Sequence, residues 1–372
     1  VSSTGKITGV FPGVAVITVK SAEDSSKKAT IKVLVQNDGK NYVNVNSATR
    51  SLYTQYVVSA HPSTIIQGFD ISKNYIFTVQ NLYSTSTDMN TNSLFINKHP
   101  RPGVSGSDSN MSLYGFGHGT NIAFEWANSK YNDTSDAYMW LAGGHYTWNN
   151  DNSKFSFDVT RDGAFPTRLA YHDNSTYTSN SVSFDTRSSV SRNDIKLYNG
   201  KNYSTTALSS KYYNIYKFYK TRSNEQVAID TTNNLFIIRV TGSSGQIFSI
   251  YKLTDIKNSS VDYIDGNIPK LATFTIPKTP LDFQGFDIAG DYVYVYYGES
   301  NRNGTQNSQG YVAMYDFLGN EKFNKKVYST STSIFEEPEG IKVYKESGKY
   351  VAYLGSSLVS GSQKYVKICT FK

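Results

Sequence analysis

The chain has 372 residues, with 37 lysines and arginines against 30 aspartates and glutamates, and a formal net charge of +7. No run of about eighteen apolar residues occurs, which argues against a membrane-spanning helix, and the basic residues are scattered, which argues against a nucleic-acid partner. A single cysteine, Cys369, excludes an internal disulfide, and we interpret it as a small buried apolar residue of the last strand.

The rest of the composition favours an all-β fold. There are 30 Tyr and 20 Phe but only 4 Met and 9 Pro, which suits strands better than helices. The first 36 residues contain three alternating runs, and we expect strands at Lys6–Val10, Ala15–Lys20 and Ala29–Val35. Three strands are too few to close a hydrophobic core.

This first segment resembles part of a known module. Gly5–Val10, Pro12–Ala15 and Ile17–Val19 follow the pattern of the second half of a bacterial group 2 Ig-like domain. The resemblance implies that residues 1–36 are the C-terminal part of a β-sandwich in a longer, exported, modular surface protein. Residues 37–48 are polar and are predicted to be a linker, so the next domain covers residues 49–372.

Residues 49–372 contain an internal repeat. Gln67–Gln80 and Gln284–Gly298 both begin with Gln-Gly-Phe-Asp-Ile and continue as an alternating aromatic and β-branched run. Counting similar units gives five copies, which begin near Gln67, His118, Glu225, Gln284 and Glu339. Repeats of about forty to sixty residues with three or four strands each predict a β-propeller.

The spacing predicts five blades, with six as the alternative. The second and third copies begin 107 residues apart, and residues 168–219 between them would form a degenerate sixth blade. In the second copy we expect strands at Ile122–Ala127, Ala137–Gly143 and Lys154–Thr160. Leu52–Ala60 is expected to supply the outer strand that closes the ring with the last copy.

Several short motifs of this region resemble the helveticin J family. They are GHGTNIAFEWA, AFPTRLAY, QVAIDTTNNLFIIRV, IFSIYKLTDI and QGFDIAGDYVYVYYG, in the order and character typical of that family. The resemblance covers roughly residues 50–372, and it implies a large, secreted bacteriocin that kills related Gram-positive cells. It implies no catalytic residues.

We therefore predict a secreted or surface-attached protein of a Gram-positive bacterium that recognises a cell-surface glycan or wall polymer. The positive net charge is compatible with steering toward an anionic wall polymer. One alternative is an adhesin or receptor-binding module that does not kill. Another is a glycan-cleaving enzyme.

Candidate ligand-binding residues follow from the propeller geometry. The first strand of each blade lines the central channel, so the residues that open the five copies are expected to face one mouth: Gln67, His118, Glu225, Gln284 and Glu339. Two carboxylates, two amides and an imidazole suit sugar hydroxyls or a hydrated cation. Alternatively, these groups satisfy one another and the strand ends.

Four acidic residues have a chemical interpretation. Glu225 and Glu339 form the weak candidate pair for a glycosidase, which requires two carboxyl groups on either side of the sugar. Asp70 and Asp287, from the repeated Gly-Phe-Asp, are interpreted as turn-capping residues.

Metal and aromatic sites give weaker signals. His118, His145 and His172 are 27 residues apart and form no metal-binding motif, so no metal or cofactor is predicted, although a structural calcium ion is left open. Trp126 and Trp140 are expected to pack between blades. Trp148, in an Asn-rich stretch, is the candidate for stacking on a sugar ring.

Overall fold

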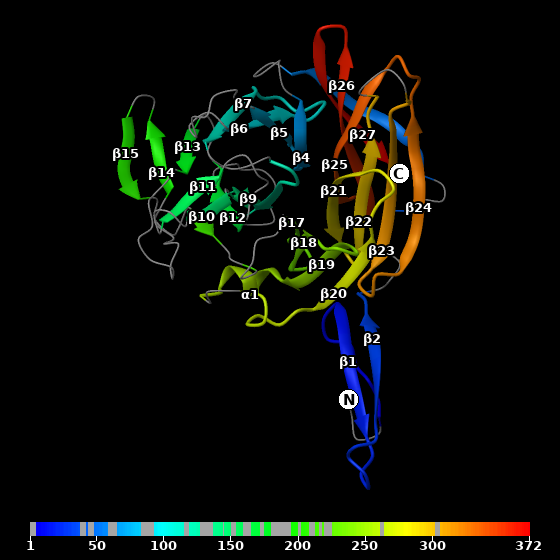
Figure 1. Ribbon diagram of the computed structural model, residues 1–372. Coiled ribbons are helices and arrows are strands. Elements are labelled where there is room, and N and C mark those ends of the chain that lie inside the picture. Colours follow the sequence, from blue (N-terminus) through cyan, green and yellow to red (C-terminus); the bar gives the residue numbers. More distant parts are fainter. Residues whose placement is uncertain are drawn as a thin grey trace.

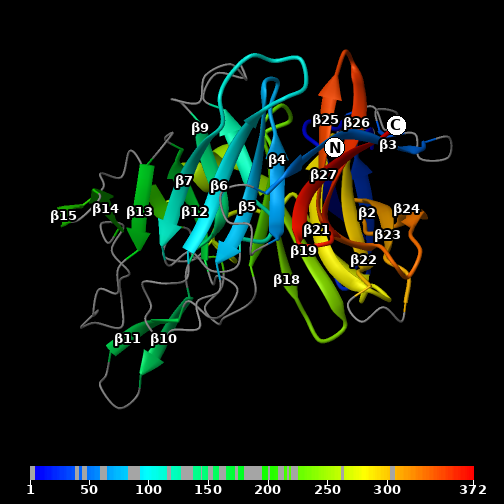
Figure 2. The same cartoon turned by 90° about the horizontal axis from the view of Figure 1, so that it is seen from above.

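Four four-stranded sheets and one seven-stranded sheet surround a common axis and form a five-bladed β-propeller (Figures 1 and 2). The computed structural model describes residues 5–37, 42–43, 48–58, 65–82, 93–114, 119–126, 137–143, 145–149, 154–158, 165–171, 175–179, 195–199, 202–207, 213–215, 218, 225–260, 264–301 and 306–372. The prediction of an all-β propeller with five blades is confirmed.

Blades 1 and 2 begin first along the chain. Blade 1 contains β4 (Ile66–Ile71), β5 (Tyr75–Leu82), β6 (Ser93–Pro100) and β7 (Ser109–Tyr114), extended by β13 (Ser175–Ser179), β14 (Ile195–Asn199) and β15 (Asn202–Ala207). Blade 2 contains β8 (Ala123–Trp126), β9 (Ala137–Gly143), β12 (Phe165–Ala170) and β16 (Tyr213–Ile215).

The other three blades are regular four-stranded meanders, except that the last is completed by an early strand. Blade 3 contains β17 (Gln226–Asp230), β18 (Leu235–Thr241), β19 (Gly245–Lys252) and β20 (Ala272–Pro277), with helix α1 (Leu253–Lys257) before β20. Blade 4 contains β21 (Asp282–Ala289), β22 (Tyr292–Glu299), β23 (Gln309–Asp316) and β24 (Glu321–Ser329). Blade 5 contains β25 (Phe335–Glu346), β26 (Lys349–Ser360), β27 (Gln363–Phe371) and β3 (Arg50–Val57).

The alternative of a sixth blade is wrong. The strands described between residues 165 and 215 extend blades 1 and 2 instead of forming a sheet of their own. The expected third strand of the second copy is also wrong, because β11 (Lys154–Asp158) pairs with β10 (His145–Asn149) outside the blade. The third strand of that blade is β12, which pairs with β9.

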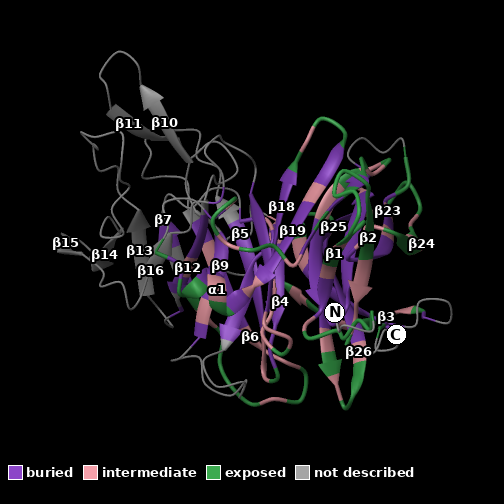
Figure 3. Ribbon diagram, turned by 90° about the horizontal axis from the view of Figure 1, so that it is seen from below, coloured by how far each residue is buried: buried purple, intermediate pink, exposed green. Residues whose placement is uncertain are grey.

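The first strand of each blade lies at the axis. Strand β4 contacts β8 and β25, and β17 contacts β8 and β21, while β21 contacts β25, so the five inner strands form a closed ring. Burial falls toward the outer edge of a blade: β22 is buried along nearly its whole length, whereas β24, at the outer edge, is mostly exposed or half-buried. Strands β18 and β19 of blade 3 are likewise almost fully buried (Figure 3).

Aromatic side chains fill the space between neighbouring blades. Phe248 of blade 3 meets Phe286 of blade 4 edge-on, with ring centroids 5.3 Å apart, and Phe77 of blade 1 stacks on Phe124 of blade 2 at 4.1 Å. Such pairs add to the free energy gained by burying apolar surface. The high content of Tyr and Phe is therefore explained by the packing of blade on blade.

The ring is closed by a strand from the beginning of the domain. Strand β3 pairs antiparallel with β27, so the first and last parts of the propeller share one sheet. This confirms the predicted closing strand, although it begins two residues earlier than expected. Cys369 in β27 is buried, as predicted.

The N-terminal segment forms a two-stranded hairpin that projects from the propeller (Figure 1). It consists of β1 (Gly13–Lys20) and β2 (Lys28–Val35). The expected strand at Lys6–Val10 is wrong: these residues form no strand, and Val10 is 93% exposed. None of the described strands pairs with them. Membership of an Ig-like domain stays a prediction.

The hairpin and the following segment are fastened to the propeller. The backbone N–H of Val14 donates to the carbonyl of Leu271 at 2.6 Å, and Phe11 packs against the core between blades 3 and 4. In the predicted linker, Val43 is buried and its N–H donates to the hydroxyl of Tyr294 at 3.3 Å. The described part of the linker is thus packed on the propeller.

Candidate functional site at the propeller axis

One end of the axis is closed by backbone that packs so tightly that glycine is favoured there. A Cβ atom added at Gly285 would lie 3.0 Å from Gly340 Cα and 3.3 Å from Asn121 Oδ1. A Cβ atom at Gly68 would lie 3.2 Å from the backbone nitrogen of Asn121. The inner strands of blades 1, 4 and 5 therefore approach one another closely beside Asn121 at these glycines.

Asn121 links three blades at this closure. It precedes β8, its Nδ2 donates to the carbonyl of Val227 at 2.7 Å, and its Oδ1 accepts from the backbone N–H of Phe286 at 3.1 Å. Its φ of 62° is in the left-handed region, which asparagine tolerates better than most residues. Because the side chain is 5% exposed, water cannot replace these bonds.

Replacing Asn121 by alanine is expected to lower the free energy of unfolding by about 2 kcal/mol, since a buried donor and a buried acceptor lose their partners. Urea denaturation followed by tryptophan fluorescence measures this change. Asn234→Ala is the matched control, because Asn234 has a φ of 55° but makes its hydrogen bonds in an exposed turn. Equal losses in the two variants would contradict the role given to Asn121.

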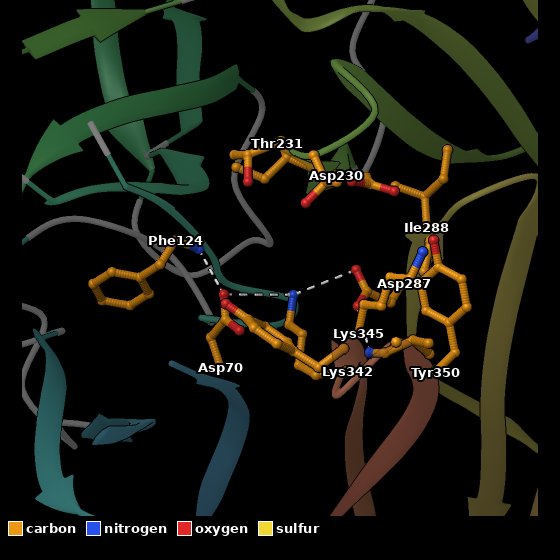
Figure 4. Close-up of a pocket in the computed structure, with 15 residues that line it drawn as sticks. Asp70, Phe124, Asp230, Thr231, Asp287, Ile288, Lys342, Lys345 and Tyr350 are labelled. Atoms are coloured by element: carbon orange, nitrogen blue, oxygen red, sulfur yellow. Dashed lines mark hydrogen bonds and ion pairs between the residues drawn. The ribbon is translucent and has the colours of Figure 1, made fainter. Parts of the chain in front are cut away.

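A pocket opens on the other side of this closure, toward the turns that follow the inner strands. Its volume is about 370 Å³, within the lower part of the range of small-molecule sites. All five blades contribute to its lining. The lining includes Asp70, Phe124, Asp230, Thr231, Asp287 and Lys342 (Figure 4).

The floor of the pocket holds two carboxylates and one ammonium group. Nζ of Lys342 in β25 lies 4.0 Å from Oδ2 of Asp70 in β4 and 3.8 Å from Oδ1 of Asp287 in β21. All three residues are at most 6% exposed, and their side chains point toward one another (Figure 4). Burial of a charge is tolerated when an opposite charge lies nearby.

Each carboxylate also binds the neighbouring blade. Asp70 Oδ2 accepts from the backbone N–H of Phe124, and Asp287 Oδ2 accepts from that of Val343, at 2.6 and 2.7 Å. The interpretation of Asp70 and Asp287 as turn-capping residues is therefore wrong. They lie within inner strands, where they join one blade to the next and face the pocket.

Burial changes the acidity of these groups. It raises the pKa of Asp287 to about 7, against the opposing influence of Lys342 and the N–H of Val343. It raises the pKa of Asp70 as well, although Lys342 and two backbone N–H groups oppose the change. At neutral pH the floor therefore lies close to a change in protonation.

Asp230 belongs to the side of the pocket that faces the floor. It ends β17, and its Oδ2 accepts from the backbone N–H of Gly290 at 2.8 Å, while its Oδ1 accepts from that of Asn233 at 2.9 Å. Burial raises its pKa, and the hydrogen bonds from Asn233 and Gly290 oppose the rise. Figure 4 shows Asp230 and Thr231 across the pocket from Lys342.

Four of the predicted ligand-binding residues, Gln67, Glu225, Gln284 and Glu339, are not among the residues that line this pocket. Gln67, Gln284 and Glu339 each directly precede one of the glycines that close the axis, so they share its other end. Glu225 directly precedes β17 and is 1% exposed, whereas Glu339 is 5% exposed. Their role in binding, and that of Glu225 and Glu339 as a catalytic pair, stays a prediction.

The structure says little about the other two predicted ligand-binding residues. His118 lies outside the described residues. Trp148 lies in β10, which pairs with β11, and its role in stacking stays a prediction. Trp140 is fully buried and contacts Phe236 of blade 3, as expected for packing between blades.

Metal and membrane sites can be checked within the part of the chain that the structure describes. There, no group of three or more His, Cys, Asp or Glu side chains is arranged to hold a metal ion. In the same part, no helix has the length and apolar character needed to cross a membrane.

The sequence analysis missed Asp230, and on the pocket floor it also missed Lys342. Its signal was present: Gly-Ile-Lys-Val at Gly340–Val343 occupies the same place in its blade as Gly-Phe-Asp-Ile at Gly68–Ile71 and Gly285–Ile288. Two aspartates and one lysine at equivalent positions of a closed ring must face the same axis. Aligning the copies residue by residue, rather than by their first residues, would have found the pocket floor.

Comparison with known proteins finds a similar fold but no matching family. No protein-family model and no curated protein sequence matches the chain. Among solved structures, the tail fiber of Staphylococcus aureus phage P68 matches 88% of the chain at 18% identity with a TM-score of 0.56. The chain spans about half of that protein, which is covered to 53%. A match to the S. cerevisiae core factor has 10% identity and a TM-score of only 0.26, and it covers 98% of the chain and 58% of that structure. The fold of this chain is therefore similar to that of a phage tail fiber.

Proposed function

We propose that the protein is a binding module that recognises a cell-surface glycan or wall polymer through the axial pocket. The observation that carries the proposal is the pocket itself. It is preformed at the point where all five blades converge, and its lining combines three carboxyl groups with two lysines and two threonines. Concave sites with a few converging polar groups are typical of ligand binding. A fold shared with a tail fiber of a bacterial virus is consistent with recognition at a bacterial surface.

The direct test is sedimentation of the protein with purified cell walls from a panel of Gram-positive bacteria. Thr231→Trp places a large ring beside the pocket, and we expect it to weaken wall binding at least about tenfold. The matched control is Thr275→Trp, an exposed position in β20 of the same blade, which should bind like the wild type. Absence of binding to every wall, or equal binding by the two variants, would contradict the proposal.

The sequence resemblance to the helveticin J family extends this proposal to a secreted bacteriocin of a Gram-positive bacterium. In that case binding would be the first step of killing related cells. Viable counts of bound bacteria measure this second step. A fall in viable counts that Thr231→Trp abolishes would support the bacteriocin, whereas unchanged counts under saturating binding would leave an adhesin or receptor-binding module.

A further inference from the structure

Among the described residues, the ammonium group of Lys342 has no hydrogen-bond acceptor. Lys342 is 3% exposed, and the carboxylate oxygens nearest to its Nζ lie 3.8 and 4.0 Å away. Hydrogen bonds from nitrogen to oxygen measure about 2.7–3.2 Å, so these contacts are ion pairs without hydrogen bonds. An ammonium group has three N–H donors, and buried donors require acceptors.

A ligand in the pocket can reach this ammonium group. Lys342 lines the pocket, and its ammonium group points into it, toward the side on which Asp230 and Thr231 lie (Figure 4). Oδ1 of Asp287, by contrast, is enclosed by protein atoms, whereas Nζ of Lys342 is not. The ammonium group is therefore the part of the floor that a ligand meets.

The carboxyl groups of the pocket already accept hydrogen bonds from the backbone. Both oxygens of Asp70 accept from backbone N–H groups, each at 2.6 Å. Asp230 uses both of its oxygens in the same way, at 2.9 and 2.8 Å. Asp287 uses Oδ2, at 2.7 Å, and its Oδ1 is the enclosed atom. What the floor offers to a ligand is thus the donors of Lys342, and the ligand must supply acceptor oxygens.

The charge on the floor depends on the protonation of its carboxyl groups. Burial raises the pKa of Asp70, and it raises that of Asp287 to about 7. Below pH 7 Asp287 is therefore mostly neutral, and the ammonium group of Lys342 attracts an oxyanion. Above pH 7 the carboxylate of Asp287, 3.8 Å from Nζ, competes with that oxyanion and repels it.

The other groups around the pocket do not reverse this balance. Lys345 is exposed and adds positive charge, burial raises the pKa of Asp230, and tyrosines add no charge near neutral pH. Once Asp287 is protonated, two ammonium groups face two carboxyl groups of raised pKa, which leaves room for one negative charge. The charged and titratable groups that line the pocket or lie beside Asp287 are Asp70, Asp230, Asp287, Tyr294, Lys342, Tyr344, Lys345 and Tyr350.

We infer that the axial pocket binds a singly charged oxyanion of its polymer, a carboxylate or a phosphodiester, through hydrogen bonds from Lys342 Nζ, and that binding takes up a proton near neutral pH. The inference rests on the proposed function, since it names the group of the polymer that the pocket holds. It adds a charge selectivity and a pH dependence that binding to a wall polymer does not require.

The first test uses the wild-type protein and isothermal titration calorimetry at about pH 6 and about pH 8. The probes are methyl glucuronide, which carries a carboxylate, glycerophosphoglycerol, which carries a phosphodiester, and uncharged methyl glucoside. At about pH 6 at least one anionic probe should bind about tenfold more tightly than methyl glucoside. Its affinity should fall about tenfold at about pH 8, where roughly nine-tenths of Asp287 is ionised. The tighter anionic probe identifies the oxyanion as carboxylate or phosphodiester.

Three results of this titration would overturn the inference: no binding of either anionic probe, equally tight binding of methyl glucoside, or equal affinity at the two pH values. The proposed function is tested separately. If walls sediment the wild-type protein in a Thr231-dependent way while neither anionic probe binds, only the inference fails.

The second test addresses the two residues directly. Lys342→Met removes the donors and keeps the length of the side chain, so affinity for the better anionic probe at about pH 6 should fall at least about tenfold. Lys349→Met, which removes the same charge from an exposed position of β26, should bind like the wild type. Asp287→Asn cannot titrate, so it should lose most of the pH dependence of binding. Wild-type affinity in a folded Lys342→Met protein, or the wild-type pH dependence in Asp287→Asn, would overturn the inference.

Discussion

Replacing Arg50 by methionine is expected to lower the free energy of unfolding by about 3 kcal/mol or more. Arg50 is the first residue of β3, and its guanidinium pairs with Glu336 of β25, which is 1% exposed. The same guanidinium lies 4.1 Å from the ring centroid of Tyr328. Removing the arginine leaves a buried carboxylate with Lys367 as its remaining charged partner among the described residues, at 2.9 Å.

The effect should be large because this ion pair joins the closing strand to the inner strand of the same blade. Chemical denaturation of the variant measures it, and Lys349→Met, an exposed change in β26, is the control. The double variant Arg50→Met with Glu336→Gln should recover much of the loss, because the buried negative charge is then removed as well. A double variant as unstable as the single one would show that packing of the arginine, and not its charge, closes the ring.

Of all the predicted strands, the closing strand had the least support from its neighbours in sequence. Strand β3 carries a recognisable alternating run, but its partner β27 is more than 300 residues away, and only the ring topology brings them together. The expectation of a closed propeller ring, rather than any feature that identifies a partner for residues 52–60, assigned the strand to the last copy.

Two other predictions were wrong although the local strand pattern was clear. The run Lys154–Thr160 has a good strand pattern, yet β11 pairs outside the blade because β12 occupies the third place beside β9. The run Lys6–Val10 also alternates, but no neighbouring strand lies along it among the described residues. Alternation indicates that a segment can form a strand, whereas the available partner decides whether and where it does.

The pocket shows the same limit at the level of single residues. Asp287 was visible in the repeated motif, and a carboxylate close to a strand end is ordinarily a turn residue. What gives it another role is Lys342, 55 positions later, whose ammonium group lies 3.8 Å away, and Val343, whose N–H binds it. Neither contact is local, and the burial that raises the pKa of Asp287 against both of them comes from the assembled ring, so that pKa could not be predicted from its neighbours in sequence.

That pKa leads to the second large effect. The free energy of unfolding of the wild-type protein is expected to contain a contribution from Asp287 of about 2 kcal/mol that is present near pH 5 and lost near pH 8. The folded protein holds this proton up to a pKa of about 7, whereas the unfolded chain releases it near the ordinary value of 3.8. The folded state therefore binds the proton more tightly, and stability falls as the pH rises through about 7.

The measurement is urea denaturation at pH values between about 5 and 8, for the wild type and for Asp287→Asn. The difference between the two proteins reports on Asp287 and its interaction with Asp70, because Asp230, whose pKa is also raised, and His99, whose pKa burial lowers, contribute to both. The amide that Asp287→Asn introduces cannot titrate. The free energy of unfolding of the variant should therefore rise relative to that of the wild type as the pH increases from about 5 to 8. Asp282→Asn should follow the wild-type profile, since Asp282 is exposed at the start of β21. Parallel profiles for the wild type and Asp287→Asn would mean that Lys342 keeps Asp287 ionised throughout, and that the pocket floor carries a fixed charge at every pH tested.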